Sequence, residues 1–238
     1  MSSFTIEVVT SSVRSSVNAQ NGGAGRIELC SALATAGVTP SSGLLEAVKQ
    51  HVRIPVYVMI RPREGDFCYD KYELEVMKRE IDLLKKSGAD GFVFGVLHDN
   101  GMVNFEITKQ LVDYCKPLPV TFHRAFDCTP DLAEALETII ETGCERILTS
   151  GGKANGLEGI GNIIDLNQKA AGRISLMPGG GIRPETFDDI LHTEIREYHM
   201  SGRSMIKSPM YPTLFEMDWA ETETAAIKTV VAKCAEIF

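Results

Sequence analysis

The 238-residue sequence predicts a single (β/α)8 TIM barrel, in which eight parallel strands alternate with helices around one core. Eight short apolar, β-branched runs begin 22 to 36 residues apart, an interval that fits one strand plus one helix. Amphipathic helical patterns lie between these runs, and no G-x-G-x-x-G motif of an open dinucleotide-binding sheet follows the first. We therefore expect one domain over residues 1–238, with 205–238 as a C-terminal extension and helix.

The predicted elements follow in order along the chain. The eight strands are expected to begin at Phe4, Arg26, Pro55, Gly91, Pro119, Arg146, Ile174 and Glu197. Helical patterns cover residues 44–51, 73–86, 107–114, 132–142, 160–170 and 185–192, and the final one runs from about 220 to 237. Residues 205–219 contain two prolines, which predict an irregular segment.

Composition limits the partners and the compartment. The formal net charge of −8 argues against nucleic acid or an anionic membrane as a partner, because both are negatively charged. No apolar stretch is long enough for a membrane helix, and the N-terminus lacks the pattern of a secretion signal, so a cytoplasmic location is expected. The six cysteines form no CxxC motif, which argues against a redox pair and a structural zinc site.

Polar residues occur at strand positions that should face the inside of the barrel, where catalytic groups lie at the C-terminal ends. Any one of them alone could be a structural partner, but two buried carboxylates need cations and donors around them. Together they predict acid/base chemistry, with Glu7 and Glu28 as acid and base, His123 as proton shuttle and Arg61 as anion clamp. The predicted catalytic residues are Glu7, Glu28, Arg61, His123 and His199.

Glycine-rich turns follow three consecutive predicted strands. Such turns let an anion approach backbone N–H groups, although they can also serve only to reverse the chain. The predicted anion-binding residues are Ser150, Gly151, Gly152, Gly180, Gly181, Ser201 and Gly202.

Apolar side chains in the extension predict self-association. Met210, Tyr211, Phe215 and Trp219 lie beyond the last strand, where an exposed apolar patch needs a cover. A two-fold symmetric homodimer is therefore expected.

Several long motifs resemble the CutC family of copper homeostasis proteins, in the same order along nearly the whole chain. They are GRIELC (25–30), VMIRPREGDFCY (58–69), GADGFVFGVL (88–97), PVTFHRAFD (119–127), RILTSGG (146–152) and MPGGGI (177–182). The resemblance implies a cytoplasmic barrel, often oligomeric, that is linked to copper tolerance and binds Cu(I) through cysteine.

The resemblance also implies a metal ligand at Cys30, which ends the IELC motif. Members proposed to hold copper have a second cysteine two residues after the glutamate of the first strand, where this chain has Val9. Cu(I) prefers two or three soft ligands, so Cys30 with only Met59, Met200 or a histidine predicts weak binding.

Three functions follow as alternatives. The first is a metal-handling protein that binds Cu(I) through Cys30 with His123 or His199. The second is an enzyme that acts on a small phosphorylated or carboxylated metabolite, and the third is an interaction scaffold. The expected partner is accordingly a small anionic ligand or a metal ion, since the fold itself hosts many chemistries.

Overall fold

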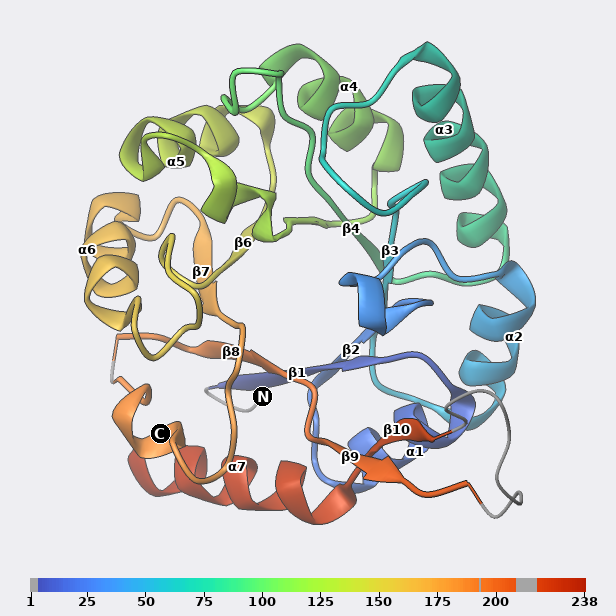
Figure 1. Cartoon of the computed structure of the whole chain (residues 1–238), viewed down its shortest axis with the longest axis vertical. Coiled ribbons are helices and arrows are strands. Elements are labelled where there is room, and N and C mark those ends of the chain that lie inside the picture. Colours follow the sequence, from blue (N-terminus) through green and yellow to red (C-terminus); the bar gives the residue numbers. More distant parts are fainter. Residues whose placement is uncertain (1–3, 193, 209–217) are drawn as a thin grey trace.

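Eight parallel strands form the barrel (Figure 1) in the computed structural model, which describes residues 4–192, 194–208 and 218–238. Hydrogen-bonded neighbours follow the order β7-β6-β5-β4-β3-β2-β1-β8, and the two end strands pack against each other to close the ring. The predicted (β/α)8 barrel is confirmed. Its strands are β1 (Thr5–Thr10), β2 (Arg26–Leu29), β3 (Val56–Met59), β4 (Gly91–Phe94), β5 (Val120–Phe122), β6 (Arg146–Thr149), β7 (Ser175–Pro178) and β8 (Glu197–Met200).

Helices surround the strands on the outside of the ring (Figure 1). They are α1 (Val13–Asn21), α2 (Ser42–His51), α3 (Lys71–Lys86), α4 (Phe105–Cys115), α5 (Leu132–Thr142), α6 (Ile160–Ala170) and α7 (Thr224–Ile237). Short 3-10 turns are η1 (Leu33–Thr35), η2 (Arg124–Cys128) and η3 (Phe187–Asp189). None of the helices in the described ranges is long and apolar enough to cross a membrane.

Two helical segments differ from the prediction. Helix α1 was not predicted because its sequence, VRSSVNAQN, is mostly polar; Ser12 begins it by accepting a hydrogen bond from Ser15 N at 3.1 Å. In place of a helix over 185–192 the chain forms only η3. Phe187 packs edge-on against Tyr198 there, with 5.0 Å between ring centroids, so a single turn buries the aromatic ring.

The C-terminal extension lies at one edge of the barrel, beside α1 (Figure 1). Strands β9 (Arg203–Ile206) and β10 (Trp219–Thr222) pair antiparallel. They replace the two ends of the predicted irregular segment, of which residues 209–217 lie outside the described ranges, and the first turn of the predicted final helix, which begins at Thr224 instead of about 220. Helix α7 then lies against α1, and the approach is close: a Cβ at Gly22 would lie 2.5 Å from Ile227 Cβ. Figure 1 shows this helix covering the side of the barrel next to β1 and β8.

The strands separate two interiors. Ile6, Val8 and Ile27 belong to the large apolar core between the barrel and its helices. The residues between them on the same strands, including Glu7 and Glu28, face the inside of the barrel. Inside, a small apolar cluster of Cys30, Tyr57, Met59 and Val93 is accompanied by charged groups rather than by the usual branched aliphatic side chains.

Candidate functional site

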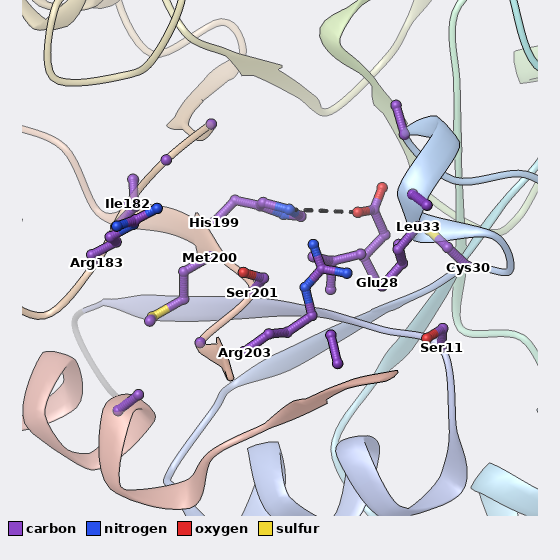
Figure 2. Close-up of a pocket in the computed structure, with 18 of the residues that line it drawn as sticks. Ser11, Glu28, Cys30, Leu33, Ile182, Arg183, His199, Met200, Ser201 and Arg203 are labelled. Carbon is purple, nitrogen blue, oxygen red and sulfur yellow. Dashed lines mark ion pairs between the residues drawn. The ribbon is translucent and has the colours of Figure 1, made fainter. Parts of the chain in front are cut away.

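His199 stands between two buried carboxylates near the centre of the barrel. Strand β8 pairs with β1 so that His199 is opposite Glu7, and its Nδ1 lies 2.8 Å from Glu7 Oε1. Its Nε2 faces Glu28 Oε2 at 3.6 Å, the ion pair drawn in Figure 2. All three residues are at most 8 % exposed. These three residues also offer ligand atoms within 4.8 Å of one another.

An ionic network lies beneath this group, towards the N-terminal ends of the strands. Arg26 donates to Glu7 and also to Glu197 Oε2, with 2.5 Å between Arg26 Nη2 and that oxygen. Arg146 Nε donates to the same Glu197 oxygen at 2.6 Å. Two arginines thus offset the two carboxylates of Glu7 and Glu197, which is the condition for burying such charges.

The sequence prediction missed these network residues. Each of them lies an even number of residues before a predicted inward-facing residue of the same strand, so it faces inward too. The pairs are Arg26 and Glu28, Arg146 and Ser150, and Glu197 and His199. Following the alternation of inward and outward residues back to the start of each strand would have identified them.

The surroundings give the three central groups different proton affinities. Burial opposes ionisation of Glu7, but Arg26 and then His199 outweigh it and hold the Glu7 pKa well below its usual range. Burial raises the pKa of Glu28 to about 7, since His199 only partly compensates. Burial disfavours charge on His199 too, but its hydrogen bond to Glu7 and the nearby Glu28 raise its pKa. The site therefore holds a fixed anion, a histidine that favours its cationic form and a carboxyl that titrates near neutral pH.

His123 faces the same cavity as a neutral group. Its Nδ1 accepts a hydrogen bond from Ala125 N at 3.2 Å, while its buried Nε2 has no partner among the described residues. Burial and then Arg61 lower the His123 pKa to about 3. With Nδ1 an acceptor, the neutral ring carries its proton on Nε2. This geometry suits a hydrogen-bond donor better than the predicted proton shuttle.

Gly95 is required by the position of His123. A Cβ at Gly95 would lie 2.6 Å from His123 Nδ1, closer than nonbonded atoms approach. The bare backbone of the residue after β4 therefore lets the histidine ring lie flat against the barrel wall.

Arg61 lines the cavity but most of its donors are already used. Its Nη1 donates to Thr35 O and Gly37 O, both at 2.9 Å, and its Nη2 donates to Gly65 O at 2.7 Å. Only its buried Nε lacks a partner in the described ranges. Arg61 therefore fixes two loops of the mouth, which uses three of its five N–H donors and leaves two for the predicted anion clamp.

The predicted anion-binding turn after β6 already holds a carboxylate. Asp127, which follows β5, accepts hydrogen bonds from Ser150 N at 2.9 Å and from Gly152 N at 3.1 Å. Arg124 Nε donates to Asp127 at 2.8 Å, and Arg124 Nη2 to Ser150 Oγ at 2.7 Å. Gly151 packs against Gly159 in the same turn, at φ +68°. The remaining predicted anion-binding residues, Gly180, Gly181, Ser201 and Gly202, line the cavity.

A cavity of about 1210 Å³ opens at the C-terminal mouth of the barrel. Four of the five predicted catalytic residues line it, whereas Glu7 lies beneath His199 and does not reach it. The polar or charged residues of its wall include Glu28, Arg61, His123, Arg124, Arg183, His199, Ser201 and Arg203.

Cys30, the predicted metal ligand, also lines the cavity. It packs with Met59, and Val9 lies against the same cluster. Burial, followed by Glu28 and Glu7, raises the pKa of the Cys30 thiol well above its usual range. The thiol is therefore protonated at neutral pH, whereas metal binding needs the thiolate.

Known proteins resemble this chain over most of its length. Residues 4–204 match the model of the CutC family. The copper homeostasis protein cutC homolog of Mus musculus is 53% identical over 208 residues, which are 87% of this chain and 76% of that protein. A family protein CutC of Xanthomonas axonopodis pv. citri (strain 306) is 42% identical over 95% of this chain and 97% of its own.

A solved structure shows the same fold. The crystal structure of CutC from Streptococcus agalactiae superimposes with a TM-score of 0.77 at 32% identity and covers 82% of this chain and 97% of that one. The motifs, the relatives and the fold agree, and on them the chain belongs to the CutC family.

Proposed function

We propose that this chain is an enzyme that moves a proton on a small anionic metabolite bound at the barrel mouth. The observation that supports it best is the Glu28–His199 pair, which opens into the cavity while Glu7 and Arg26 hold it from behind. A purely structural interior would need no carboxyl with an unbonded oxygen, yet Glu28 Oε1 is buried without a partner among the described residues.

The proposed step uses Glu28 as the base. Its carboxylate takes a proton from a carbon of the ligand, the C–H bond breaks, and the electron pair passes into an adjacent carbonyl. His199, as an imidazolium, donates its Nε2 proton to the oxygen that gains charge. As the product forms, Glu28 gives its proton back to the carbon and His199 takes its proton back from the oxygen. A carboxyl whose pKa is about 7 suits this task, because it is present in both forms at neutral pH.

His123 supports the same step from another strand. Its Nε2–H is buried and has no partner among the described residues, and the His123 side chain forms part of the cavity wall. A neutral donor in a protected site can bind an oxygen that becomes negatively charged during the reaction. This role requires no change in the protonation of His123.

Exchange of ligand C–H protons in D2O, followed by NMR, tests the proposal. The probes are small 2-oxo, 2-hydroxy and amino acids together with sugar phosphates. We expect the wild-type protein to accelerate exchange in at least one probe, and Glu28→Gln and His199→Asn to remove the acceleration. Glu106→Gln, an exposed change on α4, is the matched control. Absence of acceleration with every probe would contradict the proposal.

Copper handling is the second candidate function. The mouse and human relatives are named copper homeostasis proteins, and in this chain Cys30 lies beside Met59 on the cavity wall. Two soft atoms at one wall favour a Cu(I) site, but a protonated thiol without a second cysteine fits Cu(I) poorly. The free cysteines of the described ranges agree with the cytoplasmic location that forms part of this proposal.

A further inference from the structure

One arginine of the C-terminal extension points into the cavity that the proposed catalytic pair also lines. Arg203 begins β9 and lines the cavity. Figure 2 shows its side chain pointing into the cavity, towards the side on which His199 and Glu28 meet. Within the described parts of the chain its guanidinium forms no hydrogen bond or ion pair, so its donors are available to a ligand.

The backbone that carries Arg203 is firmly held. Arg203 pairs with Thr222 of β10, and Thr222 is bonded to α1: its N donates to Ser15 Oγ at 3.2 Å, and its O accepts from Asn18 Nδ2 at 2.9 Å. Glu223 N donates to Gly202 O at 2.8 Å. A free guanidinium on an anchored backbone is typical of a preorganised binding group.

The other cations of the mouth are mostly engaged. Arg61 bonds to three loop carbonyls, and Arg124 is paired with Asp127. Arg183, on the loop after β7, is exposed and also lines the cavity. Arg183 and Arg203 are thus both without a side-chain partner in the described ranges, and Arg203 is the one that Figure 2 shows pointing towards Glu28 and His199.

The anion that fits is a carboxylate rather than a phosphate. Barrel enzymes bind phosphate through several backbone N–H groups in a glycine turn, and in the turn after β6 two of these groups, Ser150 N and Gly152 N, already bind Asp127. The rim also contains the carboxylates of Glu185, Asp218 and Glu223, which repel a dianion more than a monoanion. A guanidinium binds a carboxylate in two parallel hydrogen bonds.

We propose that Arg203 binds the carboxylate of a small carboxylic acid, and that this carboxylate is attached either to the carbon at which the proton moves or, in a 2-oxo acid, to the carbonyl carbon beside it. This second part of the inference rests on the proposed function, because the proposed function takes Glu28 and His199 as the reacting groups. The binding of the carboxylate by Arg203 does not depend on any chemistry. The substrates are therefore small 2-oxo, 2-hydroxy or 2-amino acids.

Calorimetric titration with pyruvate, lactate, alanine, malate and inorganic phosphate tests this inference. We expect at least one of the acids to bind the wild-type protein, and Arg203→Leu to weaken it at least about tenfold. Arg203→Lys should bind with intermediate affinity, because lysine keeps the charge but loses the paired donors. Arg79→Leu, an exposed change on α3, should bind as the wild type does.

Three results would overturn the inference: unchanged acid binding in Arg203→Leu, tighter binding of phosphate than of every acid, or no acid binding at millimolar concentration. Glu28→Gln separates the two proposals, since it should retain acid binding while losing proton exchange. Arg203-dependent binding without exchange in the wild type would reject the proposed reaction and keep the carboxylate site. Proton exchange that is unchanged in Arg203→Leu would reject the carboxylate site and keep the proposed reaction.

Discussion

His199 bonds to Glu7 across the adjacent strands β8 and β1, with 2.8 Å between Nδ1 and Oε1. This bond fixes the imidazole ring so that its other nitrogen faces Glu28 at 3.6 Å and the cavity beyond. The carboxylate behind the ring stays ionised because Arg26 is bonded to it. The two glutamates therefore have different roles: Glu7 positions His199, and Glu28 faces the ligand in the proposed reaction.

Glu7→Gln should destabilise the protein strongly. It leaves Arg26 without the buried one of its two carboxylate partners, and breaking a buried ion pair costs roughly 3 to 5 kcal/mol. Urea denaturation at neutral pH measures the loss, with Glu106→Gln as the control for a surface change.

Acid should remove the effect of Glu7→Gln. Because the Glu7 pKa is lowered on folding, its stabilising contribution is present above the usual glutamate value of 4.5 and declines as the pH falls below that value. The difference in unfolding free energy between wild type and variant should therefore shrink in acid. An equal difference at neutral pH and about pH 3 would show that Glu7 acts by packing alone.

Glu28→Gln should have the opposite effect. Folding raises the Glu28 pKa to about 7, so the stability that comes from its neutral form is complete below about 4.5 and is lost as the pH rises through about 7. The glutamine cannot ionise and avoids this loss. At about pH 8 the variant should be more stable than the wild type, by on the order of 2 to 3 kcal/mol. Thermal unfolding from pH 5 to 8 checks it, and a wild-type stability that does not fall over that range would contradict it.

The alternation of inward and outward residues along the strands predicted those site residues that lie on regular strands or directly after them. It placed Glu7, Glu28, His123 and His199 inside the barrel because inward and outward positions alternate along a strand. Attention to the C-terminal strand ends alone left out Arg26 and the rest of the ionic network, which lie one layer deeper.

Other features depend on contacts that no local pattern contains. Asp127 lies in a 3-10 turn and reaches a loop 23 residues further along the chain, at Ser150. The position of the Arg203 guanidinium, which has no partner among the described residues, depends on how β9 pairs with β10. In both cases tertiary structure determines which polar groups are engaged, so the sequence could show the residue types but not their partners.

A homodimer should form through the apolar surface beside β9 and β10. Met205 is 59% exposed and Trp219 is 44% exposed. Met210, Tyr211 and Phe215, which carried the same prediction, lie outside the described residues. Light scattering at micromolar concentration should give twice the monomer mass, and the double change Met205→Ser with Trp219→Ser should give monomers. Tyr72→Ser, an exposed aromatic on α3, is the control, and a wild-type particle of monomer mass would reject the dimer.

Copper affinity should depend on the residue at position 9. Strand β1 pairs with β2, and Val9 packs against the inner cluster that contains Cys30, so a cysteine at position 9 would place a second thiol beside the first. Two thiols suit Cu(I) far better than one, and Val9→Cys should therefore bind it more than about tenfold tighter than the wild type.

Val8→Cys is the matched control, because Val8 belongs to the core on the other side of the sheet. Competition with a Cu(I)-specific chelator measures all of these proteins, and adding Cys30→Ser to Val9→Cys should cancel the gain. Tight wild-type binding that disappears in Cys30→Ser would instead make copper the natural ligand, and the acid/base roles of Glu28 and His199 would lose their main support.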